Sequence, residues 1–73
     1  MKILSITKNS TGSQIGLKPG DSIESIDGSR VRDVIDYRFK VSDDTILLRV
    51  RQDGGIQEYE IEKDYDDDLG LEL

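Results

Sequence analysis

Three turn signals divide this chain into short segments and constrain its fold more than any other feature. The Lys-Pro-Gly-Asp sequence at 18–21 suits a type II turn, because proline fixes φ at the second position and glycine accepts a positive φ at the third. The Asp-Gly pair at 27–28 and the Asp-Gly-Gly sequence at 53–55 are typical of tight turns between antiparallel strands. Together these turns predict a small domain built mainly from antiparallel strands.

The segments around the last turn alternate as half-buried strands do. Ile46, Leu48 and Val50 occupy alternate positions, and Tyr59 and Ile61 alternate with glutamates after the turn. We therefore expect a hairpin with one apolar face. On its other face, we expect Arg49 and Arg51 to lie beside the glutamates of the returning strand. Residues 3–7 are expected to form a further strand.

Two helices are expected between the strands. Residues 10–15 predict a very short helix, with Ser10 as its N-cap and Gly16 as its stop. A longer helix is expected from residue 32 or 33 to residue 41, since acidic side chains occupy its early turns and a lysine lies near its end.

The longer helix carries two apolar stripes. Val34, Tyr37 and Val41 form one, and Ile35 and Phe39 form another, roughly 120° away around the helix. The first stripe is expected to cover the sheet. For the second stripe the default expectation is burial in the core, and the alternatives are a groove wall or contact with another domain.

The composition excludes most catalytic chemistry. The 73 residues include no cysteine and no histidine, which removes thiol nucleophiles, Cys/His zinc sites, iron–sulfur ligands, disulfide bonds and the commonest general base. Acidic pairs such as residues 43 and 44 have no activated nucleophile beside them. We therefore expect a non-catalytic domain with no cofactor and no metal.

The formal net charge of −6 makes nucleic acids and anionic membranes poor partners, because both repel an acidic surface. No apolar run approaches the ~20 residues of a membrane-spanning helix. The apolar start at residues 3–6 is too short for a signal peptide. The expected location is the cytoplasm.

A longer pattern covers residues 9–31. It consists of small residues, a short helix, Gly-Leu-Lys-Pro-Gly-Asp at 16–21, an apolar pair, Ile-Asp-Gly at 26–28, and Val31. This pattern resembles that of bacterial PDZ domains, and the helix and the hairpin at 51–55 follow in the family's order. The resemblance implies an α+β fold, mainly β: a partly open antiparallel barrel or sandwich with one short and one longer helix.

One departure from the family concerns the order of its parts. PDZ domains have a carboxylate-binding loop, commonly Gly-Leu-Gly-Phe, before the strand that pairs with a peptide. Here the matching sequence, Leu-Gly-Leu at 69–71, follows the last long strand. We therefore expect a circularly permuted domain over residues 1–73, cut from a longer protein, whose peptide-pairing strand begins at 71–73.

A narrower resemblance concerns the Asp-Tyr-Arg-Phe sequence at 36–39 and the ending at 62–71. Together with the PDZ-like start, these are similar to the N-terminal domain of uncharacterised bacterial radical-SAM-like iron–sulfur proteins. The cluster cysteines of that group have no counterpart here. This resemblance implies an alternative role, in which the domain packs as a structural or regulatory unit on the downstream catalytic domain of an iron–sulfur oxidoreductase.

The PDZ resemblance implies binding by β-augmentation, in which an extended peptide pairs with a strand edge beside the helix. Loop amides at 69–71 would hold a terminal carboxylate, the first helical stripe would line apolar pockets, and Arg38 would add a charge contact. For residues 69–71, a plain chain end is the alternative. The expected site residues are Leu69, Gly70, Leu71, Val34, Tyr37, Arg38 and Val41.

The acidic connector at 64–68 argues against a simple copy of the family's ligand. Three aspartates at 66–68 precede the expected loop, and each repels a terminal carboxylate by about 0.5 kcal/mol at ~8 Å in water. We therefore expect a basic or internal segment, or the protein's own next domain, as the partner. The isolated domain is expected to be a monomer or a weak edge-paired dimer.

The same acidic run also has the start of a calcium-loop pattern. Its aspartates at 64, 66 and 68 match the first, third and fifth positions of such a loop, but Leu69 replaces the glycine at the sixth. A solvated connector is therefore the expectation.

Overall fold

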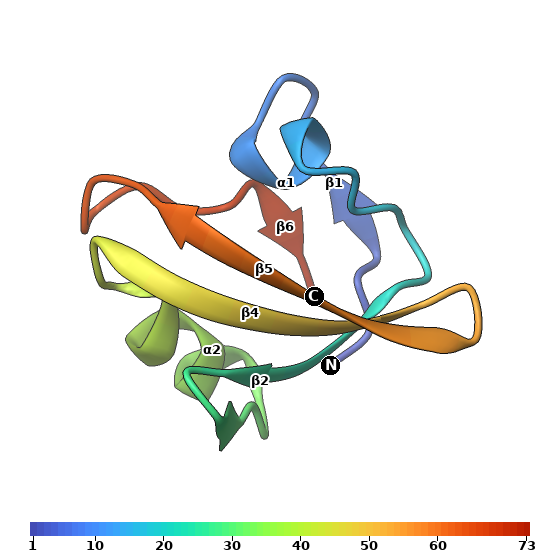
Figure 1. Ribbon diagram of the computed structural model, residues 1–73. Coiled ribbons are helices and arrows are strands. Elements are labelled where there is room, and N and C mark those ends of the chain that lie inside the picture. Colours follow the sequence, from blue (N-terminus) through green and yellow to red (C-terminus); the bar gives the residue numbers. More distant parts are fainter.

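Six strands and two helices make up the computed structural model, which describes all 73 residues. In chain order they are β1 (Ser5–Ile6), α1 (Thr11–Gln14), β2 (Ser22–Ile26), β3 (Ser29–Arg30), α2 (Val34–Val41), β4 (Thr45–Gln52), β5 (Gly55–Glu62) and β6 (Leu71–Glu72). The strands form two antiparallel sheets, and the expected α+β class, mainly β with one short and one longer helix, is confirmed (Figure 1).

Left-handed backbone conformations at the predicted turns set the path of the chain. Asp27 and Gly28 have φ of 52° and 78°, and Asp53 and Gly54 have φ of 48° and 81°. Two successive left-handed residues define the type I′ turn, whose twist matches that of antiparallel strands. Gly20 has φ of 97°, as the third position of a type II turn requires.

The larger sheet has the strand order β3-β2-β4-β5 and supplies most of the core. Ile46, Leu48 and Val50 on one face of β4 are fully buried, and Ile61 on β5 is 4% exposed. The alternation of apolar residues therefore predicts the inner face of this hairpin correctly.

The outer face of the same hairpin needs a correction. Arg49 lies across from Glu58 as expected, but Arg51 lies across from Ile56 rather than a glutamate. Arg51 instead pairs with Glu24 on β2, with 2.9 Å between Nε and Oε1. The reason is that β4 lies between β2 and β5, so side chains of β4 also contact side chains of β2.

The smaller sheet joins the two ends of the chain. It consists of β1 and β6 alone, paired antiparallel. The Thr7 N–H donates to the Gly70 carbonyl and the Leu4 N–H to the Glu72 carbonyl, each over 2.7 Å. The strand expected at 3–7 is shorter than predicted, because the Ile3 N–H donates instead to the Asp21 carbonyl at 2.8 Å.

Helix α1 sits directly on the segment that leads into β6. Ser10 caps the helix by accepting from the Ser13 N–H at 3.2 Å, as predicted. The Gly12 N–H donates to the Leu69 carbonyl at 2.8 Å. A Cβ on Gly12 would lie 2.8 Å from that oxygen and 2.7 Å from Cδ2 of Leu71, so only glycine allows this approach.

Helix α2 begins with a set of side-chain contacts around Asp36. The N-cap Asp33 accepts from the Asp36 N–H at 2.7 Å, and the Asp36 carboxylate accepts from the Arg32 N–H at 3.0 Å. Lys40, one turn later, donates to the same carboxylate. The hydrogen bonds from Lys40 and from the Arg32 backbone hold the pKa of Asp36 below its ordinary value.

The two apolar stripes of α2 have different surroundings. Tyr37 and Val41 are each 5% exposed and Val34 is half-buried, so the first stripe covers the core as expected. The default expectation for the second stripe is wrong, because Ile35 and Phe39 are both 80% exposed. The core covers the side of α2 that carries Tyr37 and Val41, and no other part of the domain covers the side that carries Ile35 and Phe39.

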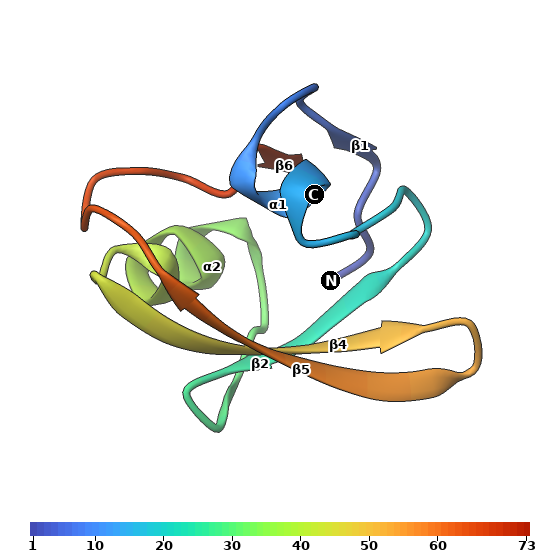
Figure 2. The same ribbon diagram turned by 45° about the horizontal axis from the view of Figure 1, so that its top comes forward.

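Helix α2 and the β1–β6 pair lie on the same side of the larger sheet (Figure 2). The connection from β5 to β6 passes over α2 before it reaches the smaller sheet. Leu69, at the end of this connection, is fully buried in the core and anchors it. No helix here has the length and apolar character needed to cross a membrane.

Candidate functional site

A groove runs between α2 and the C-terminal segment. Two adjoining hollows form it, and they share Tyr37, Arg38 and Leu71. We call it the α2–β6 groove. The residues of its first hollow are Tyr37, Arg38, Val41, Ser42, Tyr65, Asp66, Asp67, Asp68 and Leu71. The residues of its second hollow are Val34, Tyr37, Arg38, Leu71, Glu72 and Leu73.

Five of the seven residues expected from the sequence line this groove. They are Val34, Tyr37, Arg38, Val41 and Leu71. The other two expected residues do not line the groove. Leu69 is buried in the core. Gly70 has φ of 77° and packs so closely on α1 that a Cβ there would lie 2.3 Å from Cβ of Ser10.

One edge of β6 is open on the side of the groove. The carbonyls of Gly70 and Glu72 both accept hydrogen bonds from the β1 segment. Because backbone groups alternate in direction along a strand, the N–H and C=O of Leu71 point to the opposite edge. β6 has no strand on that edge, and Leu71 lines the groove together with Tyr37 of α2. The groove therefore combines an unpaired strand edge with a helix beside it.

One amide of the loop before β6 already has an acceptor. The Gly70 N–H donates to Oδ1 of Asp68 over 2.6 Å. Asp and Asn side chains often bond the backbone two residues ahead, so the Asp-x-Gly spacing in the sequence is a signal for this contact that our sequence analysis missed.

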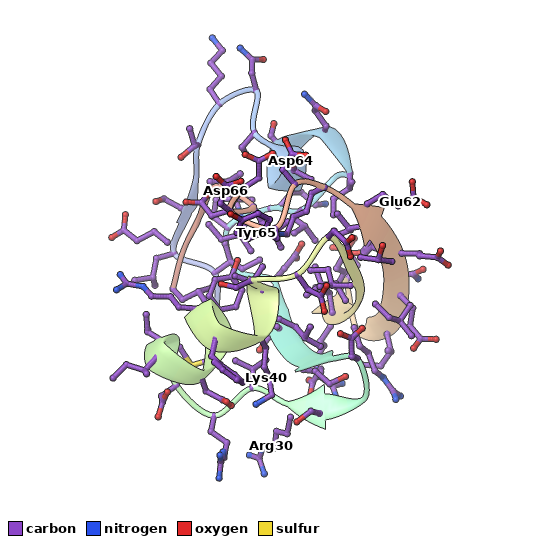
Figure 3. The ribbon with its side chains drawn as sticks, turned by 90° about the vertical axis from the view of Figure 1, so that its left-hand side faces the viewer. Arg30, Lys40, Glu62, Asp64, Tyr65 and Asp66 are labelled. Atoms are coloured by element: carbon purple, nitrogen blue, oxygen red, sulfur yellow. The ribbon has the colours of Figure 1, made fainter.

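The first hollow is acidic along one wall. Asp66, Asp67 and Asp68 are exposed, and none of them forms an ion pair. Arg38 on α2 lines both hollows and also has no ion-pair partner. Asp64, Tyr65 and Asp66 lie together on the connection between β5 and β6, apart from Arg30 and Lys40 (Figure 3). No group of three carboxylates is placed to hold a metal ion.

The Tyr37 hydroxyl is the one buried side-chain polar atom without a hydrogen-bond partner. Burial raises the pKa of this phenol well above its ordinary value, and the negative charge of Asp68 raises it further. A buried donor without a partner costs stability and is uncommon in folded proteins. Its position at the acidic end of the groove makes it a candidate ligand contact.

Several residues of the groove were not expected from the sequence. Ser42, Tyr65, Glu72 and Leu73 line it without having been expected there. Tyr65 is 70% exposed within the acidic connector. An aromatic residue between aspartates is the signal that could have identified it, since a solvated connector has no need of one.

A comparison with family models bears on this geometry. A model described as PDZ domain matches residues 2–52, well over half of the chain. The chain belongs to the PDZ domain family. The match includes α2 but not residues 65–68 and 71–73, which form the other wall of the groove. No curated protein matches the chain.

Membership of the PDZ family confirms the coarser expectations about function. PDZ domains are generally protein- or peptide-binding modules, and they are typically non-catalytic. This domain therefore belongs to a family of interaction modules that are typically non-catalytic.

Proposed function

We propose that this PDZ domain binds an extended peptide or protein segment in the α2–β6 groove by β-augmentation. The observation that carries the proposal is the open edge of β6 at Leu71, which faces a groove lined by α2. An incoming strand would pair with the N–H and C=O of Leu71. Its alternate side chains would enter the two hollows, where Val34, Tyr37 and Leu73 supply apolar surface.

The strand arrangement supports a circular permutation of the family's order. The C-terminal β6 pairs antiparallel with the N-terminal β1, so the strand nearest the groove comes from the end of the chain. In this proposal β6 takes the role of the family's peptide-pairing strand, and β5, the last long strand, takes the role of the family's first strand.

N-methylated peptides test this mechanism directly. In a paired strand, alternate N–H groups point toward β6 and the others point away. We expect one set of alternate N-methylations to abolish binding of a short apolar peptide, measured by fluorescence anisotropy, while the other set leaves the affinity within about twofold. Equal effects from both sets would contradict β-augmentation.

A second candidate function rests on the exposed stripe of α2. We propose that Ile35 and Phe39, both 80% exposed, form a packing surface for another domain of the same parent chain, such as a radical-SAM-like domain. Burying two such side chains is worth roughly 1.5–3 kcal/mol each. Here the domain would serve as a structural or regulatory unit.

The two candidates predict different effects of one double variant. Ile35→Ser with Phe39→Ser leaves the groove residues intact, so peptide affinity should not change. In the full-length parent protein, the same double variant should increase hydrogen exchange along α2. Unchanged exchange along α2 would contradict the packing surface. A loss of peptide binding would show that the peptide contacts the exposed stripe of α2 and would contradict binding in the groove.

A further inference from the structure

We infer that the acidic end of the α2–β6 groove is a cation site, which takes the ammonium or guanidinium group of a side chain on the bound segment, and that Asp68 closes the neighbouring loop to a terminal carboxylate. This inference rests on the proposed function, because it names the chemistry of one part of the same groove. It implies that the domain should reject a peptide whose free C-terminal carboxylate lies at this end of the groove.

The hydrogen bonding of the Gly70 amide determines how readily a terminal carboxylate can bind at this loop. A terminal carboxylate needs free backbone N–H groups that converge on it. The Gly70 N–H is already bonded to Oδ1 of Asp68 at 2.6 Å. To bind the Gly70 N–H, a ligand carboxylate would have to displace the carboxylate of Asp68 and then remain beside its negative charge, so Asp68 opposes the binding of a terminal carboxylate at this loop.

The lining of the first hollow carries an excess of negative charge. Asp66, Asp67 and Asp68 carry three negative charges there, and Arg38 carries one positive charge. At ~8 Å in water each charge changes the affinity for a ligand charge by about twofold. The excess of two negative charges therefore favours a cation about fivefold over a neutral group, and disfavours an anion to a similar extent.

Tyr37 and Tyr65 both line the first hollow, and they can add a hydrogen bond and a ring contact to the attraction between charges. Tyr65 is 70% exposed, so the face of its ring is accessible to a cation. The Tyr37 hydroxyl is buried without a partner, and the residue is only 5% exposed. A phenolic oxygen can accept a hydrogen bond from an ammonium group, and the negative charge of Asp68 acts on this same phenol.

Three labelled peptides test the inference. All contain the same alternating valine and threonine residues, and they end in lysine amide, in norleucine amide, or in norleucine with a free carboxylate. Fluorescence anisotropy should rank their affinities in that order, with about fivefold between the first two. The difference should shrink at high salt. Tightest binding of the free carboxylate, or equal binding of the lysine and norleucine amides, would overturn the inference.

Two variants of Asp68 separate its charge from its hydrogen bond. Asp68→Asn removes the charge, and its amide oxygen can still accept from Gly70, so it should lower the lysine preference about twofold. Asp68→Ala also frees the Gly70 N–H, so the free-carboxylate peptide should bind about tenfold tighter than it does to Asp68→Asn. Equal carboxylate affinity for the two variants would contradict the closed loop. Asp44→Asn, an exposed aspartate outside the groove, is the matched charge control.

A measurement without peptides keeps the two proposals distinguishable. In NMR titrations, N-acetyl-lysine amide should shift the resonances of Tyr37 and of residues 65–68, and N-acetyl-norleucine amide should not. If no peptide binds but N-acetyl-lysine amide still gives these shifts, the proposed function fails and the cation site stands. If the peptides bind and lysine gives no shift there, the cation site fails and the groove stands.

Discussion

Two glycines bring the ends of this chain together because they have no side chain. The Leu69 carbonyl oxygen and the Leu71 side chain both lie within 3 Å of the position that a Cβ on Gly12 would occupy. Gly70 lies in a left-handed conformation against Ser10. The groove wall therefore depends on contacts at single residues.

Gly12→Ala should destabilise the domain by about 1–3 kcal/mol, because the new methyl group overlaps a backbone oxygen that cannot easily move. Chemical denaturation would measure the free energy of unfolding. Gly55→Ala is the matched control, since its Cβ would be 3.8 Å from the nearest backbone oxygen, at ordinary contact distance. Similar stability losses in the two variants would contradict the close packing of α1 on the β6 segment.

The lowered pKa of Asp36 predicts a pH dependence with a definite sign. The folded state favours the charged carboxylate, so its contribution to stability is fully present above the ordinary aspartate pKa of about 3.9 and is lost as the pH falls through the lower folded value. Carbon-detected NMR should find the titration midpoint of Asp36 below the ordinary aspartate pKa. Lys40→Met should raise the Asp36 midpoint, because it removes the largest cause of the shift. A midpoint unchanged by Lys40→Met would show that the pair does not form.

Tyr37→Phe should stabilise the domain by about 1 kcal/mol, because it removes a buried hydroxyl that has no partner. Thermal unfolding would show this as a higher midpoint. The same variant should weaken binding of the lysine peptide, since the hydroxyl is proposed as a ligand contact. A loss of stability would mean that the hydroxyl has a hydrogen-bond partner in solution.

At the scale of elements, local sequence signals predicted the secondary structure well. Both type I′ turns, both helices and the inner face of the hairpin follow from glycine positions, capping side chains and apolar alternation, which act over a few residues. The helical period also identified the two stripes of α2. It could not say that Ile35 and Phe39 are uncovered, because a period reports which residues share a face and not what lies against it.

The groove was predictable only in part for the same reason. The α2 wall follows from the helical stripe and the family resemblance. The opposite wall depends on how the 63–70 connection passes over α2, and no local rule fixes that path (Figure 2). The contact between Asp68 and Gly70 follows from a two-residue spacing, and the partnerless Tyr37 hydroxyl depends on everything that packs around it.

At the scale of the whole molecule, the open edge of β6 gives the isolated domain a tendency to pair with itself. Two copies can align their β6 edges antiparallel, but each strand is only two residues long and lies beside an acidic wall. We expect weak self-association in analytical ultracentrifugation, which increases at high salt and is suppressed by a groove-binding peptide. Association that a bound peptide does not reduce would involve a different surface, such as the exposed stripe of α2.

The most direct test of the account is an isotope-edited NMR experiment on this domain with a bound lysine-ended peptide. We predict cross-strand contacts between the peptide backbone and Leu71, together with slowed hydrogen exchange of the Leu71 amide. Side-chain contacts from the peptide should also reach Tyr37. Peptide contacts confined to other surfaces, with an unchanged Leu71 amide, would contradict the claim that the open edge of β6 is the binding strand.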